Sequence, residues 1–178
     1  MNSLILVNRR HACPPGAARD LIPVNARHPD ILLEREAVEA LSRAMEQLDG
    51  WKWIVPVSGW RSPEEQRAIY TGSLRDNGPV FTRQFVALPG HSEHQTGLAI
   101  DLGLRRPEID FIRPDFPYEG ICQKFRELAP SCGFIERYPA GKEEITGIAH
   151  EPWHFRYVGT PHAERMAHMG LTLEEYLT

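Results

Sequence analysis

The stretch Ser92-Glu93-His94-Gln95-Thr96-Gly97-Leu98-Ala99-Ile100-Asp101 places an imidazole and a carboxylate seven residues apart, with a glycine between them. On a helix, this spacing would separate the two side chains by about 10 Å along the axis. On one straight strand, an odd separation would put them on opposite faces. Two ligands of one metal ion fit neither arrangement, so we predict that the chain bends at Gly97. His94 would then lie on a loop or bulge, and Asp101 on the strand that follows.

A second stretch, Glu151-Pro152-Trp153-His154-Phe155-Arg156-Tyr157, alternates as a strand does. Its aromatic residues fall on one face, and His154 and Arg156 fall on the other. Pro152 lacks an N–H group and belongs at the start of a strand or on an edge. A turn there could bring Glu151 to the side of His154. Arg156, on the same face, could bind a carboxylate or support a ligand.

Together the two stretches offer two imidazole nitrogens and one carboxylate oxygen, from His94, Asp101 and His154. This is the three-ligand pattern of a catalytic zinc site, in which the fourth position is left for water. Glu151 stands three residues before the last ligand, where a general base could be placed. His91 and His150 lie next to these stretches, and spacing alone does not exclude either of them as a ligand.

The composition is that of one globular domain, which we expect to span residues 1–178. The net charge of −4 shows no basic bias, so a nucleic-acid partner is not expected. The apolar run at residues 4–7 is shorter than a secretory signal needs, and no later stretch approaches the length of a membrane span. Three cysteines cannot all pair with one another, and Cys122 and Cys132 bracket a predicted helix that holds them too far apart for a disulfide, which indicates reduced thiols. We therefore expect a cytoplasmic protein with no membrane insertion.

The sequence predicts helices before, between and after several short strands, which is the pattern of an α+β domain. Residues 4–8 could form a short strand, and residues 9–30, with four prolines, indicate an extended segment. Apolar residues recur every three or four positions over residues 33–48, which predicts a helix that Gly50 can end. Residues 53–58 have the pattern of a strand.

A helix start follows that strand. Ser62 is a suitable N-cap, Pro63 suits the first helical position, and Glu65 completes a capping box. Arg61 is therefore expected at a strand-to-helix junction rather than on a mobile loop. Residues 71–91 are rich in glycine and proline and predict a long loop that leads to the first stretch.

Further along the chain the pattern predicts a loop at residues 105–118, a helix at 120–132, a strand at 134–137, a loop at 138–149, a helix from Thr160 to Gly170 and a capping box at Thr172. The loop at residues 105–118 would form a wall or lid of the substrate cleft. The whole predicts one compact domain with short strands and flanking helices.

The pattern Ser-x-His-x-x-Gly-x-Ala-x-Asp, followed by Glu-x-Trp-His, resembles the zinc D-alanyl-D-alanine peptidases. These are the VanX dipeptidases, the VanY carboxypeptidases and the bifunctional VanXY enzymes, and the resemblance to VanXY covers most of the chain. Further matching stretches are residues 59–61, 84–90 and 144–148. The resemblance implies a small antiparallel sheet that carries the zinc, a fold shared with the Hedgehog signalling domain. It also favours His94, Asp101 and His154 over the neighbouring histidines.

The resemblance also implies roles for other residues. Arg61 would stabilise charge on the scissile carbonyl oxygen, whereas the residues alone favour its pairing with a surface carboxylate. Glu151 would act as the general base, and the Ser92 hydroxyl would form a hydrogen bond with the substrate. Gln66, one turn into its helix, is a weaker candidate for contact with the substrate.

The implied reaction is zinc-dependent hydrolysis of free D-Ala-D-Ala and of the terminal D-Ala of the muramyl pentapeptide precursor. Removing both would contribute to vancomycin resistance by favouring precursors that end in another residue. Two alternatives stay open, a peptidoglycan L-alanyl-D-glutamate endopeptidase and a catalytically silent zinc-binding module. Glu151 and Arg61 argue against the silent module, because structural zinc needs neither of them.

Overall fold

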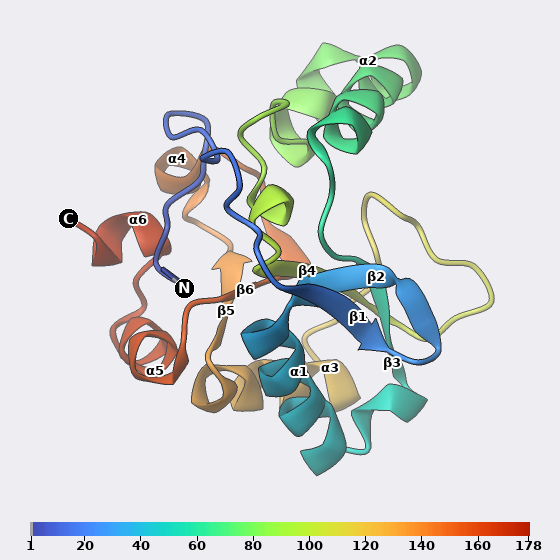
Figure 1. Cartoon of the computed structure of the whole chain (residues 1–178), viewed down its shortest axis with the longest axis vertical. Coiled ribbons are helices and arrows are strands. Elements are labelled where there is room, and N and C mark those ends of the chain that lie inside the picture. Colours follow the sequence, from blue (N-terminus) through green and yellow to red (C-terminus); the bar gives the residue numbers. More distant parts are fainter. Residues whose placement is uncertain (1) are drawn as a thin grey trace.

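The computed structural model describes residues 2–178 and has at its centre a four-stranded antiparallel sheet in the order β3-β4-β6-β5 (Figure 1). Its strands are Ile54–Ser58 (β3), Ala99–Leu104 (β4), Phe134–Tyr138 (β5) and Glu151–Tyr157 (β6). A hairpin of Leu21–Asn25 (β1) and His28–Glu34 (β2) forms a separate two-stranded sheet.

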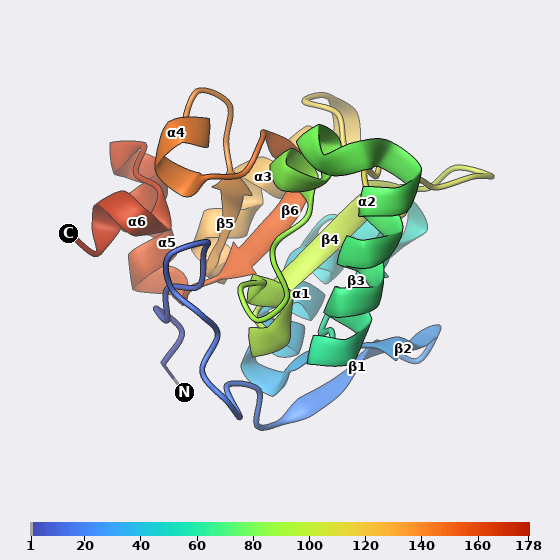
Figure 2. The same cartoon turned by 90° about the horizontal axis from the view of Figure 1, so that it is seen from above.

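Helices lie on both sides of the four-stranded sheet. They are Arg35–Gln47 (α1), Pro63–Phe85 (α2), Gly120–Leu128 (α3), Glu143–Thr146 (α4), Thr160–Met169 (α5) and Leu173–Tyr176 (α6). Short 3₁₀ helices are formed by Gly50–Lys52, Glu93–Thr96 and Ala129–Cys132. Figures 1 and 2 show α1 and α3 on one side of the sheet and α2 on the other. The predicted α+β class, with a small antiparallel sheet flanked by helices, is confirmed.

The main hydrophobic core lies between the sheet and helices α1 and α3. Ile100 of β4, Phe155 of β6 and Phe125 of α3 are fully buried in it. The rings of Phe125 and Phe155 meet edge to face, with their centroids 5.0 Å apart. Because side chains alternate along a strand, Asp101 and His154 are left on the opposite face of the sheet.

Two predictions near the start of the chain are wrong. Residues 4–8 form no strand, and only an isolated bridge joins Asn8 to His11. The segment predicted to be extended is extended in β1 and at the start of β2, although the pairing of these two strands was not predicted. Strand β2 also continues through Glu34, so α1 begins at Arg35 rather than at residue 33. Leu33 is buried in the same core as α1, so its apolar character alone did not distinguish strand from helix.

The start of α2 is formed as predicted. The Ser62 hydroxyl accepts a hydrogen bond from the backbone N–H of Glu65, and the Glu65 carboxylate accepts one from the backbone N–H of Ser62. The junction places Arg61 between the end of β3 and the beginning of a capped helix. Its backbone is therefore fixed on both sides.

The long loop predicted for residues 71–91 is mostly wrong, because α2 continues to Phe85 through a kink. Gly78 has a φ of 78°, and Pro79 begins the second helical segment, where a missing N–H group is tolerated. The Ser73 and Thr82 hydroxyls, 2.7 Å apart and buried, join the two segments. The glycine and proline therefore bend the helix instead of ending it.

The two ends of the chain lie close together, as Figure 1 shows for the N-terminal segment and helices α5 and α6. The Ser3 hydroxyl donates to the Val158 carbonyl at 3.0 Å, and the Asn8 amide donates to Glu174 at 3.0 Å. The capping box predicted at Thr172 is present. Within residues 2–178, no helix combines the length and the apolar character needed to cross a membrane.

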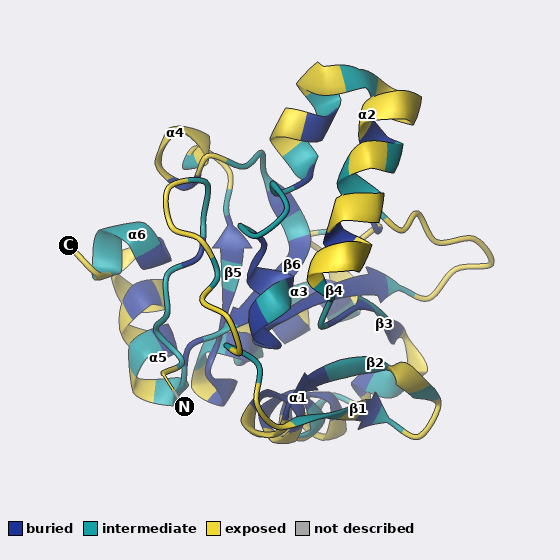
Figure 3. Ribbon diagram, turned by 45° about the horizontal axis from the view of Figure 1, so that its top comes forward, coloured by how far each residue is buried: buried dark blue, intermediate teal, exposed yellow. Residues whose placement is uncertain are grey.

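Burial differs sharply between the parts of the molecule. Figure 3 shows largely buried strands in the sheet, whereas α2 and the loop at residues 105–118 are largely exposed. The three cysteines are free, as predicted. The sheet is therefore the buried part of the molecule, and α2 and the loop are its exposed parts.

Candidate metal centre

His94 lies on the 3₁₀ helix Glu93–Thr96, which ends at Gly97 in the left-handed region, with a φ of 72°. The predicted bend at this glycine is therefore present. The backbone also approaches closely here, since a Cβ atom at Gly97 would lie 2.7 Å from a methyl carbon of Leu21. The His94 Nδ1 atom lies 2.6 Å from the Gly59 carbonyl oxygen. Hydrogen bonding there leaves Nε2 to face the centre.

Asp101 and His154 are directly paired across strands β4 and β6. Both are buried on the face of the sheet that points away from the main core. One Asp101 oxygen lies 2.8 Å from His154 Nδ1, and the other lies 3.1 Å from His94 Nε2. Strand pairing thus brings together Asp101 and His154, which are 53 residues apart in the sequence, and the bend at Gly97 adds His94.

These three residues fit a zinc ion. One donor atom from each of His94, Asp101 and His154 lies within 4.8 Å of the others, and all three residues are buried. Tetrahedral bonds of zinc to nitrogen and oxygen bring the ligand atoms to roughly 3.3 Å of one another. In the described part of the chain, His91 and His150 belong to no such group. His91 instead faces the Asn8 carbonyl oxygen at 2.9 Å.

Glu151, at the start of β6, is buried beside the cluster. One of its oxygens lies 3.8 Å from His154 Nδ1. Burial raises the pKa of Glu151 to about 8, because the attraction of His154 offsets only part of the cost of desolvation. In the metal-free protein this carboxyl group therefore favours its neutral form more than an exposed glutamate does.

Arg61 lies on the other side of the cluster and is fixed by three hydrogen bonds. It donates to Asp101 at 2.9 Å, to the Ser58 hydroxyl at 2.9 Å and to the Gln66 side-chain oxygen at 3.3 Å. Phe111 covers the guanidinium, 5.5 Å from the centre of the ring. The surface ion pair that the residues alone would allow is therefore not what the structure contains.

The two predicted substrate contacts differ in their placement. Ser92 is buried and lines the pocket above the metal ligands. Gln66 is fully buried, does not line that pocket, and donates through its amide to the Ala87 carbonyl at 2.9 Å. Gln66 therefore lies behind Arg61.

The pocket has the metal ligands, Ser92, Arg61 and Glu151 as its polar part. Apolar side chains from several elements complete it, including those of Ile69, Phe85, Phe111, Ile112, Tyr138 and Trp153. Phe111 and Ile112 belong to the loop predicted to form a wall of the cleft. Sequence reasoning missed Phe85, Phe111 and Tyr138, because no local pattern indicates which apolar residue will face a site.

The two histidines have opposite protonation preferences. Burial lowers the pKa of His94 to about 4, with a contribution from the Arg61 cation. Burial also acts against the charged form of His154, but hydrogen bonding and charge from Asp101 raise its pKa to about 9. Asp101 stays ionised, because the histidines hold the pKa of this buried carboxyl well below its usual range.

Glu93 is a further residue that sequence reasoning missed. It is buried between Arg137 and Arg156, whose charges lower its pKa despite the cost of burial. Two signals in the sequence could have indicated Glu93. It is a charged residue inside the stretch at residues 92–101, and Arg156 falls on the metal-binding face of its strand. Arg156 was predicted to be able to bind a carboxylate, and in the structure it binds that of Glu93.

Residues 30–160 match the family model described as VanY, D-alanyl-D-alanine carboxypeptidase. The chain is 43% identical over 182 residues to the bifunctional D-Ala-D-Ala dipeptidase and D-Ala-D-Ala carboxypeptidase VanXYC of Enterococcus gallinarum. That alignment covers 99% of this chain and 94% of the relative.

Two solved structures are also similar. The vancomycin resistance D,D-dipeptidase VanXYg in complex with a D-Ala-D-Ala phosphinate analog has a TM-score of 0.97 and 57% identity, over 99% of this chain and 70% of that one. A mutant of the D,D-pentapeptidase VanY from a VanB-type resistance cassette, in complex with Zn(II), has a TM-score of 0.82 and 30% identity, over 100% of both chains. The chain therefore belongs to the VanY family of D-alanyl-D-alanine carboxypeptidases.

Proposed function

We propose that this chain is a zinc-dependent D,D-peptidase that hydrolyses free D-Ala-D-Ala and also removes the terminal D-Ala of the muramyl pentapeptide precursor. The observation that carries the proposal is the buried cluster of His94, Asp101 and His154 with Glu151 beside it. The similarity of the whole chain to a bifunctional D-Ala-D-Ala dipeptidase and carboxypeptidase supports the proposal that it acts on both substrates. Both are made in the cytoplasm, where we place the reaction, and their removal would contribute to vancomycin resistance.

His94, Asp101 and His154 would hold the zinc ion. When bound, zinc would polarise the scissile carbonyl group and lower the pKa of a water molecule toward neutrality. Glu151 would take a proton from the attacking water and pass it to the amine of the departing D-alanine. The support for this role is the position of Glu151, which is buried beside the cluster with a carboxylate oxygen 3.8 Å from His154 Nδ1.

Arg61 would stabilise the negative charge that develops on the carbonyl oxygen. A guanidinium group has five N–H donors, and three hydrogen bonds hold Arg61 in place. The remaining donors can act on the oxyanion, and such donors are most effective when they are fixed before the reaction. Gln66 would contribute by holding Arg61, and the Ser92 hydroxyl would form a hydrogen bond with the substrate.

The test is D-alanine release by the purified, zinc-loaded protein. The substrates are free D-Ala-D-Ala and a precursor pentapeptide ending in D-Ala-D-Ala, each with and without a chelator. Release from both substrates that stops with chelator is the expected result. Release from one alone would reduce the proposal to a dipeptidase or a carboxypeptidase. Bound zinc with no release from either would refute it and favour the endopeptidase or the silent module.

A further inference from the structure

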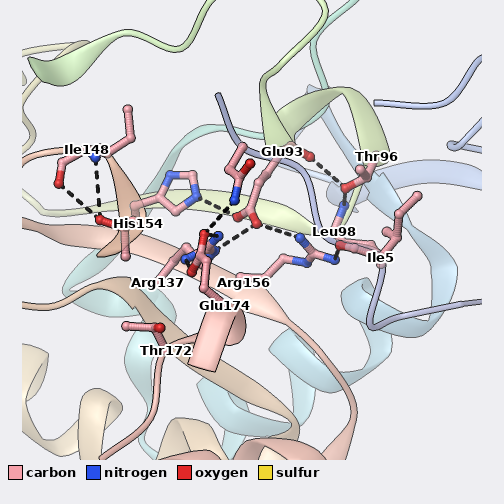
Figure 4. A network of polar contacts seen from close by, with 12 residues as sticks. Ile5, Glu93, Thr96, Leu98, Arg137, Ile148, His154, Arg156, Thr172 and Glu174 are labelled. Carbon is pink, nitrogen blue, oxygen red and sulfur yellow. Dashed lines mark hydrogen bonds and ion pairs between the residues drawn. The ribbon is translucent and has the colours of Figure 1, made fainter. Parts of the chain in front are cut away.

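Glu93 carries a buried negative charge that the proposed reaction does not use. One of its carboxylate oxygens accepts hydrogen bonds from Arg137 Nε at 2.8 Å and from Arg156 Nη1 at 2.7 Å, and all three side chains are 0% exposed (Figure 4). Burying three charges is costly unless each is well paired. The pairing with two arginines offsets part of the cost of burying the Glu93 carboxylate.

The second carboxylate oxygen of Glu93 points at His154, one of the three residues of the metal cluster. It lies 3.5 Å from His154 Nε2, and Figure 4 shows the two groups facing each other. Both atoms are buried, and among residues 2–178 neither has a hydrogen-bond partner. Because buried polar atoms are nearly always paired, we take these two atoms as partners of each other.

The proton on His154 follows from this contact. Its Nδ1 atom lies 2.8 Å from Asp101, on the side of the metal cluster. A metal ligand needs a free lone pair there, so the proton of the neutral ring must reside on Nε2, toward Glu93. His94 has the opposite arrangement, with Nδ1 directed at the Gly59 carbonyl and Nε2 at the centre.

The two arginines that hold Glu93 are themselves anchored to opposite ends of the chain. Arg137 forms a paired contact with Glu174 of α6, at 2.8 and 2.7 Å. Arg156 donates to the backbone carbonyls of Ser3 at 3.0 Å and Ile5 at 2.7 Å. The carboxylate beside His154 is therefore braced by both terminal segments.

We propose that Glu93 is a positioning residue, which fixes the ring orientation and tautomer of His154 so that Nδ1 faces the metal, and that Arg137 and Arg156 hold Glu93 in place. The inference rests on the proposed function for the identity of the metal. Removal of a carboxylate that is hydrogen-bonded to a metal-binding histidine typically lowers metal affinity by about 10- to 100-fold.

The test compares Glu93→Gln with Glu174→Gln. Both substitutions remove one carboxylate partner of Arg137, but only the first changes the group that faces His154. We expect zinc affinity, measured by competition with a chelator, to fall by about 10- to 100-fold in Glu93→Gln and to stay near wild type in Glu174→Gln. The Co(II) absorption spectrum should change in the first variant only. Equal zinc affinity in Glu93→Gln and wild type, or equal losses in both variants, would overturn the proposal.

A measurement on the wild-type protein covers the case in which Glu93→Gln does not fold. Proton–nitrogen correlation spectra of the zinc-loaded protein should show His154 protonated on Nε2 and His94 protonated on Nδ1. A proton on Nδ1 of His154 would contradict the inference. None of these measurements uses turnover, so D-alanine release by the wild type tests the proposed function separately.

Discussion

Glu151 is a buried carboxyl group that lies next to the metal cluster. It lies 3.8 Å from His154 Nδ1, and its pKa is raised to about 8 by burial. Groups with such shifted pKa values concentrate at functional sites. The residue is therefore the sharpest point at which the proposed chemistry can be tested.

We expect Glu151→Ala to lower kcat by about 10²- to 10⁴-fold, the usual contribution of general acid–base catalysis. Zinc content should be unchanged, because Glu151 is not among the three ligands. The measurement is D-alanine release together with metal analysis of the same sample. Substantial residual turnover would refute the role of general base, whereas loss of zinc would show that Glu151 helps to hold the metal.

The raised pKa of Glu151 also predicts a pH-dependent stability of the zinc-free protein. Burial favours the neutral carboxyl in the folded state, so this group favours folding fully below its unfolded pKa, and that contribution is lost as the pH rises toward about 8. Glu151→Gln stays neutral, so it should gain stability relative to wild type over this range, by up to about 1.4 kcal/mol per pKa unit. Urea unfolding of both proteins at pH 5 and pH 9, with chelator present, measures the difference. An equal difference at the two pH values would contradict the shift.

Among the elements, the turn between the 3₁₀ helix and β4 decides whether His94 and Asp101 can meet. It depends on Gly97, which has a positive φ and packs against Leu21 and Glu34 of the β1–β2 hairpin. A side chain at this position would strain the backbone and push against the hairpin. The hairpin thus contributes to the site without lining it.

We expect Gly97→Ala to destabilise the protein by about 1–2 kcal/mol, the cost of left-handed backbone for a residue with a Cβ atom, and to weaken zinc binding. Gly72→Ala is the matched control, because Gly72 lies in α2 and a Cβ atom there would meet nothing within 4 Å. In a helix this change should stabilise by about 0.5–1 kcal/mol. Urea unfolding and chelator competition give both quantities. Equal changes in stability and zinc affinity in the two variants would contradict the role assigned to the turn at Gly97.

At the scale of the whole molecule, the metal centre joins parts of the chain that are distant in sequence. His94 comes from a 3₁₀ helix, whereas Asp101 and His154 come from the two central strands. Bound metal would therefore stabilise the folded chain as a ligand that the unfolded chain does not bind.

We expect a chelator to lower the Tm of the wild-type protein. Free zinc at 1,000 times its Kd would contribute about 4 kcal/mol, or roughly 8–16 °C for a chain of this size. His154→Ala, which lacks one ligand, should show little change with chelator. Calorimetry of both proteins with and without zinc makes the comparison. A full zinc-dependent shift in His154→Ala would remove that residue from the ligand set.

Much of this molecule could be predicted from local sequence. The bend at Gly97, the strand alternation around His154 and the capping boxes at Ser62 and Thr172 all depend on neighbouring residues, and all are present. The metal cluster was predictable only in part from local sequence, because the chemistry of zinc restricts ligand types and the bend made a meeting of His94 and Asp101 feasible. The choice of His94 and His154 over His91 and His150 depended on the resemblance to the zinc D-alanyl-D-alanine peptidases.

Other features depended on packing between distant segments. The kinked continuation of α2 relies on a buried contact between Ser73 and Thr82, and β1 and β2 exist because they pair with each other. Composition indicated a loop and an extended segment there, since glycine and proline mark breaks without telling which breaks tertiary contacts will bridge.

The sequence by itself determined which residues could bind a metal, where the chain turns and which faces of the strands are apolar. Only the tertiary structure decided what surrounds them. The burial that raises the pKa of Glu151, the Phe111 ring over Arg61 and the two arginines around Glu93 all come from segments far apart in the chain. Desolvation and charge pairing depend on distances in space, and local sequence patterns do not encode those distances.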